Sequence, residues 1–120
     1  MVTPAAGKVV LVPFPFSDLS KSKLRPAIVL ASAGRGDWIL CQVTSNPYGD
    51  PRAIAVIEQS FAEGALKIDS VARPGKLFTA SGALMVSVVG VLTDDTLERI
   101  ISGVIAILRG RNDATTASSG

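Results

Sequence analysis

Pro26-Ala-Ile-Val-Leu-Ala31 is an unbroken apolar run near the start of the chain. A polar segment, Ser17–Lys23, precedes this run, and the turn formers Gly34-Arg-Gly-Asp37 follow it. A short run without a polar position indicates a strand that is buried on both faces. We therefore predict a doubly covered strand here, entered from a flexible polar loop.

Further short strands are predicted outward from this run, because apolar stretches alternate with turn formers. Pro13 and Pro15 are expected to end the first strand, since proline lacks the N–H that a sheet ladder uses. The segment Asn46-Pro-Tyr-Gly-Asp-Pro51 is dense in turn formers. The other predicted strands are Val9–Val12, Trp38–Thr44, Ala53–Ile57, Ser70–Ala72, Gly75–Thr79 and Val86–Leu92.

The last element is predicted to be a helix. Thr93 or Asp94 can cap its start, and the acidic Asp94 and Asp95 suit the positive end of the helix dipole. Gly110 is placed for a C-terminal cap. Apolar residues recur at helical spacing at Leu97, Ile100, Ile101, Val104, Ile105 and Leu108. Short strands with one closing helix predict an α+β fold, a strongly bent antiparallel sheet or small barrel with the C-terminal helix packed on it.

The length of 120 residues, with 48% hydrophobic and 18% charged positions, predicts one folded domain over residues 1–111. Residues 112–120 are small and polar, and we expect a disordered tail there. The apolar run Ala83–Leu92 is shorter than the roughly 20 residues that a membrane-spanning helix needs. The N-terminus lacks a signal-peptide pattern, so we expect a cytoplasmic protein without membrane association.

The absence of histidine excludes a Ser-His-Asp triad, a Cys-His pair and most zinc sites. Cys41 is the only cysteine, so no internal disulfide can form, and its apolar neighbours predict a buried structural thiol. No glycine-rich phosphate loop is present. We expect no metal and no cofactor, and any catalysis must use Arg, Lys, Asp, Glu, Ser, Thr or Tyr.

Arg25 belongs to a small basic cluster with Lys21 and Lys23, in a chain of net charge +2. Pro26 favours an extended backbone at Arg25, where the polar loop enters the apolar strand. A planar guanidinium there suits bidentate contact with a phosphate. On the residues alone, a surface ion pair is the more common role for such an arginine.

The segment Gln42-Val-Thr-Ser-Asn46 brings two hydroxyls and an amide to a predicted strand end. Hydroxyls in this position can hold a phosphate oxygen, and they can equally cap the following turn. Arg73-Pro74 repeats the Arg-Pro step ahead of another predicted strand. Neither pattern is specific on its own.

Together, five blocks in order closely resemble the PemK/MazF family of toxin–antitoxin toxins. The resemblance spans about residues 7 to 108. The blocks are Gly7–Asp18, Leu24–Ser32, Gln42–Ser45, Lys67–Thr79 and Gly90–Ile100.

The resemblance implies a small SH3-like barrel of the CcdB/PemK type with an added helix, usually as a homodimer. It implies metal-independent cleavage of single-stranded RNA at a short sequence, and inhibition by a cognate antitoxin. The family's catalytic arginine falls on Arg25 and its catalytic threonine on Thr44. The residues predicted to bind substrate are Phe16, Ser17, Ser20, Lys21, Lys23, Ser45, Asn46, Asp69 and Arg73.

The implied reaction is attack of a ribose 2′-hydroxyl on the adjacent phosphorus, which DNA cannot undergo. Arg25 would stabilise the developing negative charge and Thr44 would hold a non-bridging oxygen. Arginine stays protonated, so water or a carboxylate, with Asp69 as a candidate, would take the proton. Two alternatives remain: a gyrase-poisoning toxin of related fold, or a non-catalytic module that binds nucleic acid or protein.

Overall fold

Seven strands form one antiparallel sheet in the computed structural model, which describes residues 2–14 and 23–110. Their order across the sheet is β4-β6-β3-β2-β1-β7-β5. The strands are β1 (Lys8–Phe14), β2 (Lys23–Gly34), β3 (Asp37–Thr44), β4 (Ile54–Val56), β5 (Phe61–Gly64), β6 (Ser70–Ser81) and β7 (Ser87–Leu92). Two 3₁₀ turns, η1 (Glu58–Ser60) and η2 (Gly82–Leu84), and the helix α1 (Asp94–Leu108) complete the described fold. The predictions for Phe16, Ser17, Ser20, Lys21 and the tail 112–120 lie outside the described residues.

Strand β2 is buried on both faces, as its apolar run predicts. Four consecutive residues, Ala27 to Leu30, are buried. Ile28 and Leu30 belong to one core cluster, whereas Ala27 and Val29 belong to another. Because side chains alternate along a strand, the two clusters lie on opposite faces of the sheet.

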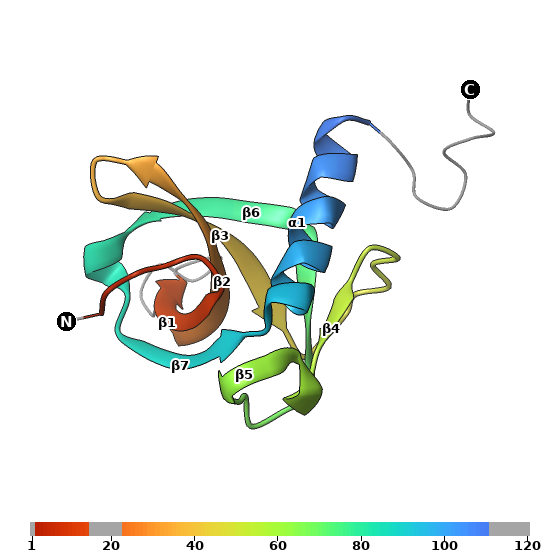
Figure 1. The fold of residues 1–120 in the computed structure, drawn as a ribbon, viewed down its shortest axis with the longest axis horizontal. Helices are drawn as coiled ribbons and strands as arrows, with labels where there is room; N and C mark the ends of the chain where they lie inside the picture. Colours follow the sequence, from red (N-terminus) through yellow and green to blue (C-terminus); the bar gives the residue numbers. More distant parts are fainter. Residues whose placement is uncertain (1, 15–22, 111–120) are drawn as a thin grey trace.

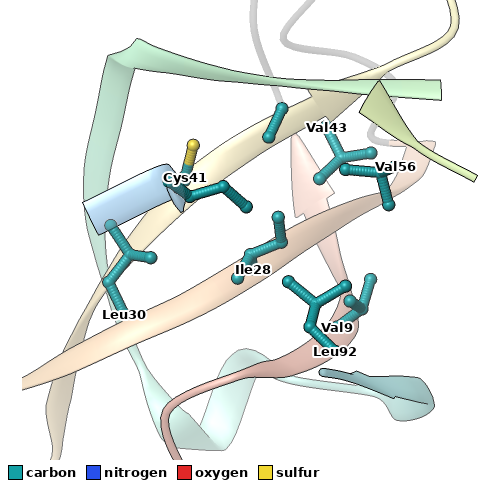
Figure 2. Packing of buried hydrophobic residues seen from close by; sticks show 9 residues of the cluster. Val9, Ile28, Leu30, Cys41, Val43, Val56 and Leu92 are labelled. Atoms are coloured by element: carbon teal, nitrogen blue, oxygen red, sulfur yellow. The ribbon is translucent and has the colours of Figure 1, made fainter. Parts of the chain in front are cut away.

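One face is covered by α1, and we call its cluster the helix-side core. Figure 2 shows its side chains converging from several strands of the sheet. Ile100 reaches this core from α1 and is fully buried. Its buried members are Val9, Ile28, Leu30, Cys41, Val43, Val56, Ala72, Leu92 and Ile100.

The other face carries the second cluster, which we call the far-side core. Trp38 and Phe78 pack against its edge. Its buried members are Val10, Val12, Ala27, Val29, Leu40 and Met85. The sheet therefore has a packed layer on each face, and β2 contributes to both.

The sheet is strongly bent, because its register shifts at several strand pairs. One shift separates Val9 from Val10 on β1, and another separates Cys41 from Gln42 on β3. Bulges of this kind bend a strand and increase its twist. Figure 1 shows the sheet curling so that α1 lies against one side of it. The outermost described strands, β4 and β5, do not pair with each other, so the bent sheet remains open rather than a closed barrel.

Several predicted strand boundaries are wrong. Strand β2 runs from Lys23 to Gly34, beyond the predicted 26–31 at both ends, because its first residues pair with β1. Pro13 does not end β1, which runs on to Phe14. At Pro13 the strand pairs with β2 alone, since its pairing with β7 reaches only Leu11. A missing N–H is tolerated where a strand has one neighbour.

The predicted strands Ser70–Ala72 and Gly75–Thr79 are one strand, β6. Gln42 pairs with Arg73 while Cys41 pairs with Leu77, so residues 74–76 have no partner on β3. Pro74 lies in this bulge, where its missing N–H breaks no pairing with β3, so the Arg73-Pro74 step does not interrupt the strand. The short edge strand β5 was not predicted.

Helix α1 begins and ends where the sequence predicts. The Thr93 hydroxyl accepts a hydrogen bond from the Thr96 backbone N–H at 3.2 Å, and Gly110 takes a φ of +69° just beyond the helix. Gly103 lies close to the buried ring of Pro74, so the helix packs on the β6 bulge. No helix in the described part of the chain is long and apolar enough to cross a bilayer.

Gly64 is expected to be essential for the β5–β7 edge. It has a φ of +70°, and an added Cβ would lie 2.7 Å from the Gly90 Cα and against the Val89 carbonyl oxygen. Gly64→Ala should lower the free energy of unfolding by about 2–4 kcal/mol, measured by urea denaturation. Gly34→Ala is the matched control, because Gly34 has a φ of +92° with open space around it. Gly34→Ala should lower the free energy of unfolding by about 1 kcal/mol. Equal losses of stability at the two positions would contradict a steric clash between the added Cβ at residue 64 and β7.

Candidate functional site

Arg25 lies near the start of β2, where the strand leaves the buried layers. It pairs with Val12 of β1 and its side chain is exposed. No other residue in the described part of the chain makes a hydrogen bond or ion pair with its guanidinium. The surface ion pair expected of an ordinary arginine is therefore not formed within the described residues, and its donors can meet a ligand.

Thr44 is the last residue of β3 and is partly exposed. Its Oγ1 accepts a hydrogen bond from the Asn46 backbone N–H at 3.1 Å. The hydroxyl thus caps the turn, which is the structural role foreseen for it. The Thr44 hydroxyl can still donate its own proton to a ligand, because accepting a hydrogen bond does not use that proton.

The register of β2 and β3 brings Arg25 and Thr44 to the same face of the sheet. The last paired residues at this end are Ala27 and Gln42. Arg25 and Thr44 each lie two residues beyond this pair along their strands. Because side chains alternate along a strand, Arg25 points to the same face as Ala27, and Thr44 to the same face as Gln42. This is the face of the far-side core, to which Ala27 belongs. A polar site therefore continues the sheet face opposite α1.

Arg73 joins this face from β6, where it is the pairing partner of Gln42. Its Nε donates to Asp50 Oδ2 at 3.0 Å, and its Nη1 donates to Gln42 Oε1 at 3.4 Å. The guanidinium carbon lies 5.0 Å from the centre of the Tyr48 ring. We call Gln42, Tyr48, Asp50 and Arg73 the Arg73 cluster.

The Arg73 cluster was only partly foreseen from the sequence. Arg73 was predicted to contact substrate, but its side chain is 18% exposed and is held by protein partners. Tyr48 and Asp50 were not predicted as site residues. The density of turn formers in Asn46–Pro51 was the one available signal, because it marked a built turn.

Asp50 is poorly suited to remove a proton at neutral pH. The Arg52 backbone N–H donates to it at 2.9 Å. This bond, and then the neighbouring Arg73, lower the pKa of the Asp50 carboxyl below its ordinary value, against the opposing effect of desolvation. A carboxylate with a lowered pKa is a weak base.

Cys41 is the buried structural thiol that the sequence predicts. It is fully buried, and burial raises the pKa of the thiol to about 12. Its Sγ donates to the Arg73 carbonyl oxygen at 3.3 Å. A thiol in this state is inert, and its contact helps to hold Arg73 in place.

Of the other predicted residues in the described part of the chain, only Asn46 hydrogen-bonds to Thr44, through its backbone N–H. Lys23 is exposed opposite Phe14, and Ser45 and Asn46 occupy the exposed turn after β3. Asp69 is exposed immediately before β6. Among the described residues, no group of three or more His, Cys, Asp or Glu side chains could hold a metal ion.

The family model for the "PemK-like, MazF-like toxin of type II toxin-antitoxin system" matches residues 5–108. The chain belongs to this family. The resemblance seen in the sequence is thereby confirmed. Toxins of the PemK/MazF family are generally endoribonucleases in toxin–antitoxin systems. A search of curated protein sequences found no match.

Solved structures show the same fold. A MazE–MazF crystal structure from Deinococcus radiodurans has a TM-score of 0.72 at 19% identity, covering 90% of this chain and 98% of that one. MazF from the same organism gives 0.69 at 21% identity, with coverages of 91% and 99%. An endoribonuclease in complex with its cognate antitoxin, from a mycobacterial species, gives 0.66 at 14% identity, with coverages of 92% and 96%. The predicted α+β fold of the PemK type is confirmed.

The Asp50–Arg73 ion pair should make stability depend on pH. Because the pKa of Asp50 is lowered in the folded state, its charge stabilises the fold above 3.8, the ordinary value. That contribution is lost as pH falls through the lowered folded-state pKa. Asp50→Asn should cost about 1 kcal/mol at pH 7, measured by urea denaturation.

The difference between Asp50→Asn and the parent chain should shrink toward zero at acid pH. Asparagine still offers an oxygen to the Arg52 N–H, so the substitution mainly removes charge. In a chain that already carries Arg73→Met, part of the cost at pH 7 should disappear. An unchanged difference between pH 7 and pH 3 would contradict this role for Asp50.

Proposed function

We propose that this chain is a sequence-specific endoribonuclease toxin that cleaves single-stranded RNA, messenger RNA included, and is neutralised by a cognate antitoxin. The observation that carries the proposal is the placement of Arg25. Arg25 is exposed two residues beyond the last β2–β3 pair, Ala27 and Gln42, and alternation along the strands puts it on the same face of the sheet as Thr44. Family membership supports the same activity.

The proposed reaction needs no external nucleophile. The ribose 2′-oxygen forms a bond to the adjacent phosphorus while the bond from phosphorus to the 5′-oxygen breaks. The products are a 2′,3′-cyclic phosphate and a 5′-hydroxyl, so the 2′-hydroxyl loses a proton and the 5′-oxygen gains one. Negative charge builds on the non-bridging oxygens as the new bond forms.

Arg25 and Thr44 act on that developing charge. The guanidinium of Arg25 donates to the non-bridging oxygens, a geometry that suits its planar fork. The Thr44 hydroxyl, already fixed as an acceptor for the Asn46 N–H, donates its proton to one of them. Donors held in place by the fold need no reorganisation when the charge appears.

Proton removal is assigned to water or to an exposed carboxylate. Arginine stays charged in proteins, and the lowered pKa of Asp50 makes that carboxylate a weak base. Asp69, exposed and near the start of β6, is the carboxylate to test.

Partners follow from the same proposal. Four of the similar solved structures hold a toxin together with an antitoxin, three of them MazE–MazF. We propose a cognate antitoxin that blocks the Arg25–Thr44 face, a homodimer as the active form, activity without a metal or cofactor, and action on RNA in the cytoplasm.

Arg25→Ala should reduce the cleavage rate of single-stranded RNA in EDTA by at least about 10²–10³, because a charge-stabilising donor is lost. Thr44→Val should cost about 10², whereas Thr44→Ser keeps both the turn cap and the donor and should stay near the parent rate. Arg109→Ala, at the exposed end of α1, is the matched control. Full activity of Arg25→Ala would overturn the site.

The cleaved ends test the chemistry. Mass spectrometry should find a 2′,3′-cyclic phosphate, and a substrate with a single 2′-deoxy nucleotide at the cleavage position should remain intact. Inhibition of DNA gyrase supercoiling without RNA cleavage would favour the gyrase poison. Inactivity in both assays, with retained RNA binding, would favour the non-catalytic module.

The pH dependence of the rate identifies the base. If Asp69 accepts the proton, Asp69→Asn should lower the rate by about 10²–10⁴, the range for a general base, and should change the acid limb of the pH–rate profile. A flat acid limb in the parent chain would exclude Asp69 and assign the proton to water.

A further inference from the structure

Tyr48 is a large aromatic side chain held out in solvent. It is 62% exposed, in the turn that follows β3. Its backbone takes a φ of +55°, a region that residues other than glycine seldom adopt. Packing in the core cannot account for this conformation, because most of the side chain contacts no protein.

The Tyr48 ring is held from the β6 side by Arg73. The guanidinium carbon lies 5.0 Å from the ring centre, within the range of a cation–π contact. Arg73 in turn is fixed by Asp50 at 3.0 Å and by Gln42 at 3.4 Å. The ring therefore rests on a side chain that is itself held at two points.

The Tyr48 backbone is tied to the candidate site by two consecutive hydrogen bonds. Its N–H donates to Asn46 Oδ1 at 2.9 Å. The Asn46 N–H donates to Thr44 Oγ1 at 3.1 Å. Tyr48 is thus linked to Thr44 along the turn. It is also linked to Arg73 of β6 through the contact with its ring.

The charges of the Arg73 cluster select the kind of group that can bind there. The Asp50 carboxylate neutralises Arg73, so the Arg73 cluster attracts a phosphate less than Arg25 does. An exposed aromatic face suits a nucleobase, since every base has a π surface that can stack on it. The Arg73 guanidinium is attracted to one face of the ring, which holds the ring in place and leaves the other face for such a stack.

We propose that Tyr48 is a stacking platform for an RNA base next to the scissile phosphate, and that Arg73 is its positioning residue. This inference rests on the proposed ribonuclease function and deepens it. It also replaces the predicted direct contact between Arg73 and the substrate by an indirect role. Phosphate contact is left to Arg25, and base contact falls to Tyr48.

Tyr48 is the only tyrosine in the chain, so incorporation of 3-fluorotyrosine gives a single ¹⁹F resonance. The probe is a single-stranded 2′-O-methyl oligonucleotide, which cannot be cut, carrying the sequence mapped at cleaved RNA ends. Binding should shift the resonance, and replacement of the stacked base by an abasic nucleotide should abolish the shift. An unshifted resonance in a saturated complex would overturn the platform.

Kinetics separate binding from chemistry. Tyr48→Asn removes the ring with a residue that tolerates positive φ, and it should raise KM about 5- to 150-fold, the range for one base–aromatic stack. The value of kcat should remain near that of the parent. Tyr48→Phe should restore KM, and Leu84→Ala, at another exposed apolar position, is the control. A fall in kcat with unchanged KM would contradict stacking.

A double substitution tests the positioning role. Arg73→Gln should raise KM on its own, because the ring loses its support. Combined with Tyr48→Asn, it should add nothing further, whereas a purely structural role would make the two effects add.

These measurements distinguish a failure of the Tyr48 platform from a failure of the proposed ribonuclease function. If the parent chain neither binds nor cuts RNA, both proposals fail. If it cuts RNA while Tyr48→Asn leaves KM unchanged, only the platform fails. A ¹⁹F shift caused by the antitoxin and not by RNA would assign Tyr48 to protein recognition and overturn the platform.

Discussion

Burial of β2 on both faces is the constraint on which the rest of this structure depends. A strand with apolar side chains pointing both ways needs two covering layers. Helix α1 supplies one layer through Ile100, and the far-side core, with Leu40 and Met85, supplies the other. The bends of the sheet serve the same end, because they let neighbouring strands close over both faces.

The candidate site lies where this double covering stops. Ala27 is still buried, whereas Arg25, two residues earlier on the same strand, is exposed. The alternation that directs Ala27 into the far-side core directs Arg25 to the same side without a core to enter. The apolar scaffold therefore presents a charged side chain in a defined direction, and the register of β2, β3 and β6 brings Thr44 and Arg73 to the same face of the sheet.

The sequence allowed the parts with strong local patterns to be predicted. The apolar run from Pro26 predicts the buried middle of β2, and the helical spacing after Thr93 predicts α1. The β6 bulge could not be predicted, since Arg73-Pro74 looks like an interruption until a partner strand accommodates it. Asp50 and Arg73 are 23 residues apart, so their ion pair follows from the sheet register and not from any local signal.

The bulge at residues 74–76 separates β6 mechanically into two halves. Arg73 keeps one register with β3, while Leu77 and the residues after it keep another. A change in length at the turn between β2 and β3 can therefore be accommodated within the bulge, without shifting the residues of the Arg73 cluster. Since Pro74 is pinned under α1 at Gly103, the helix anchors this junction. The outer half of the sheet can thus change in length while the candidate site retains its alignment.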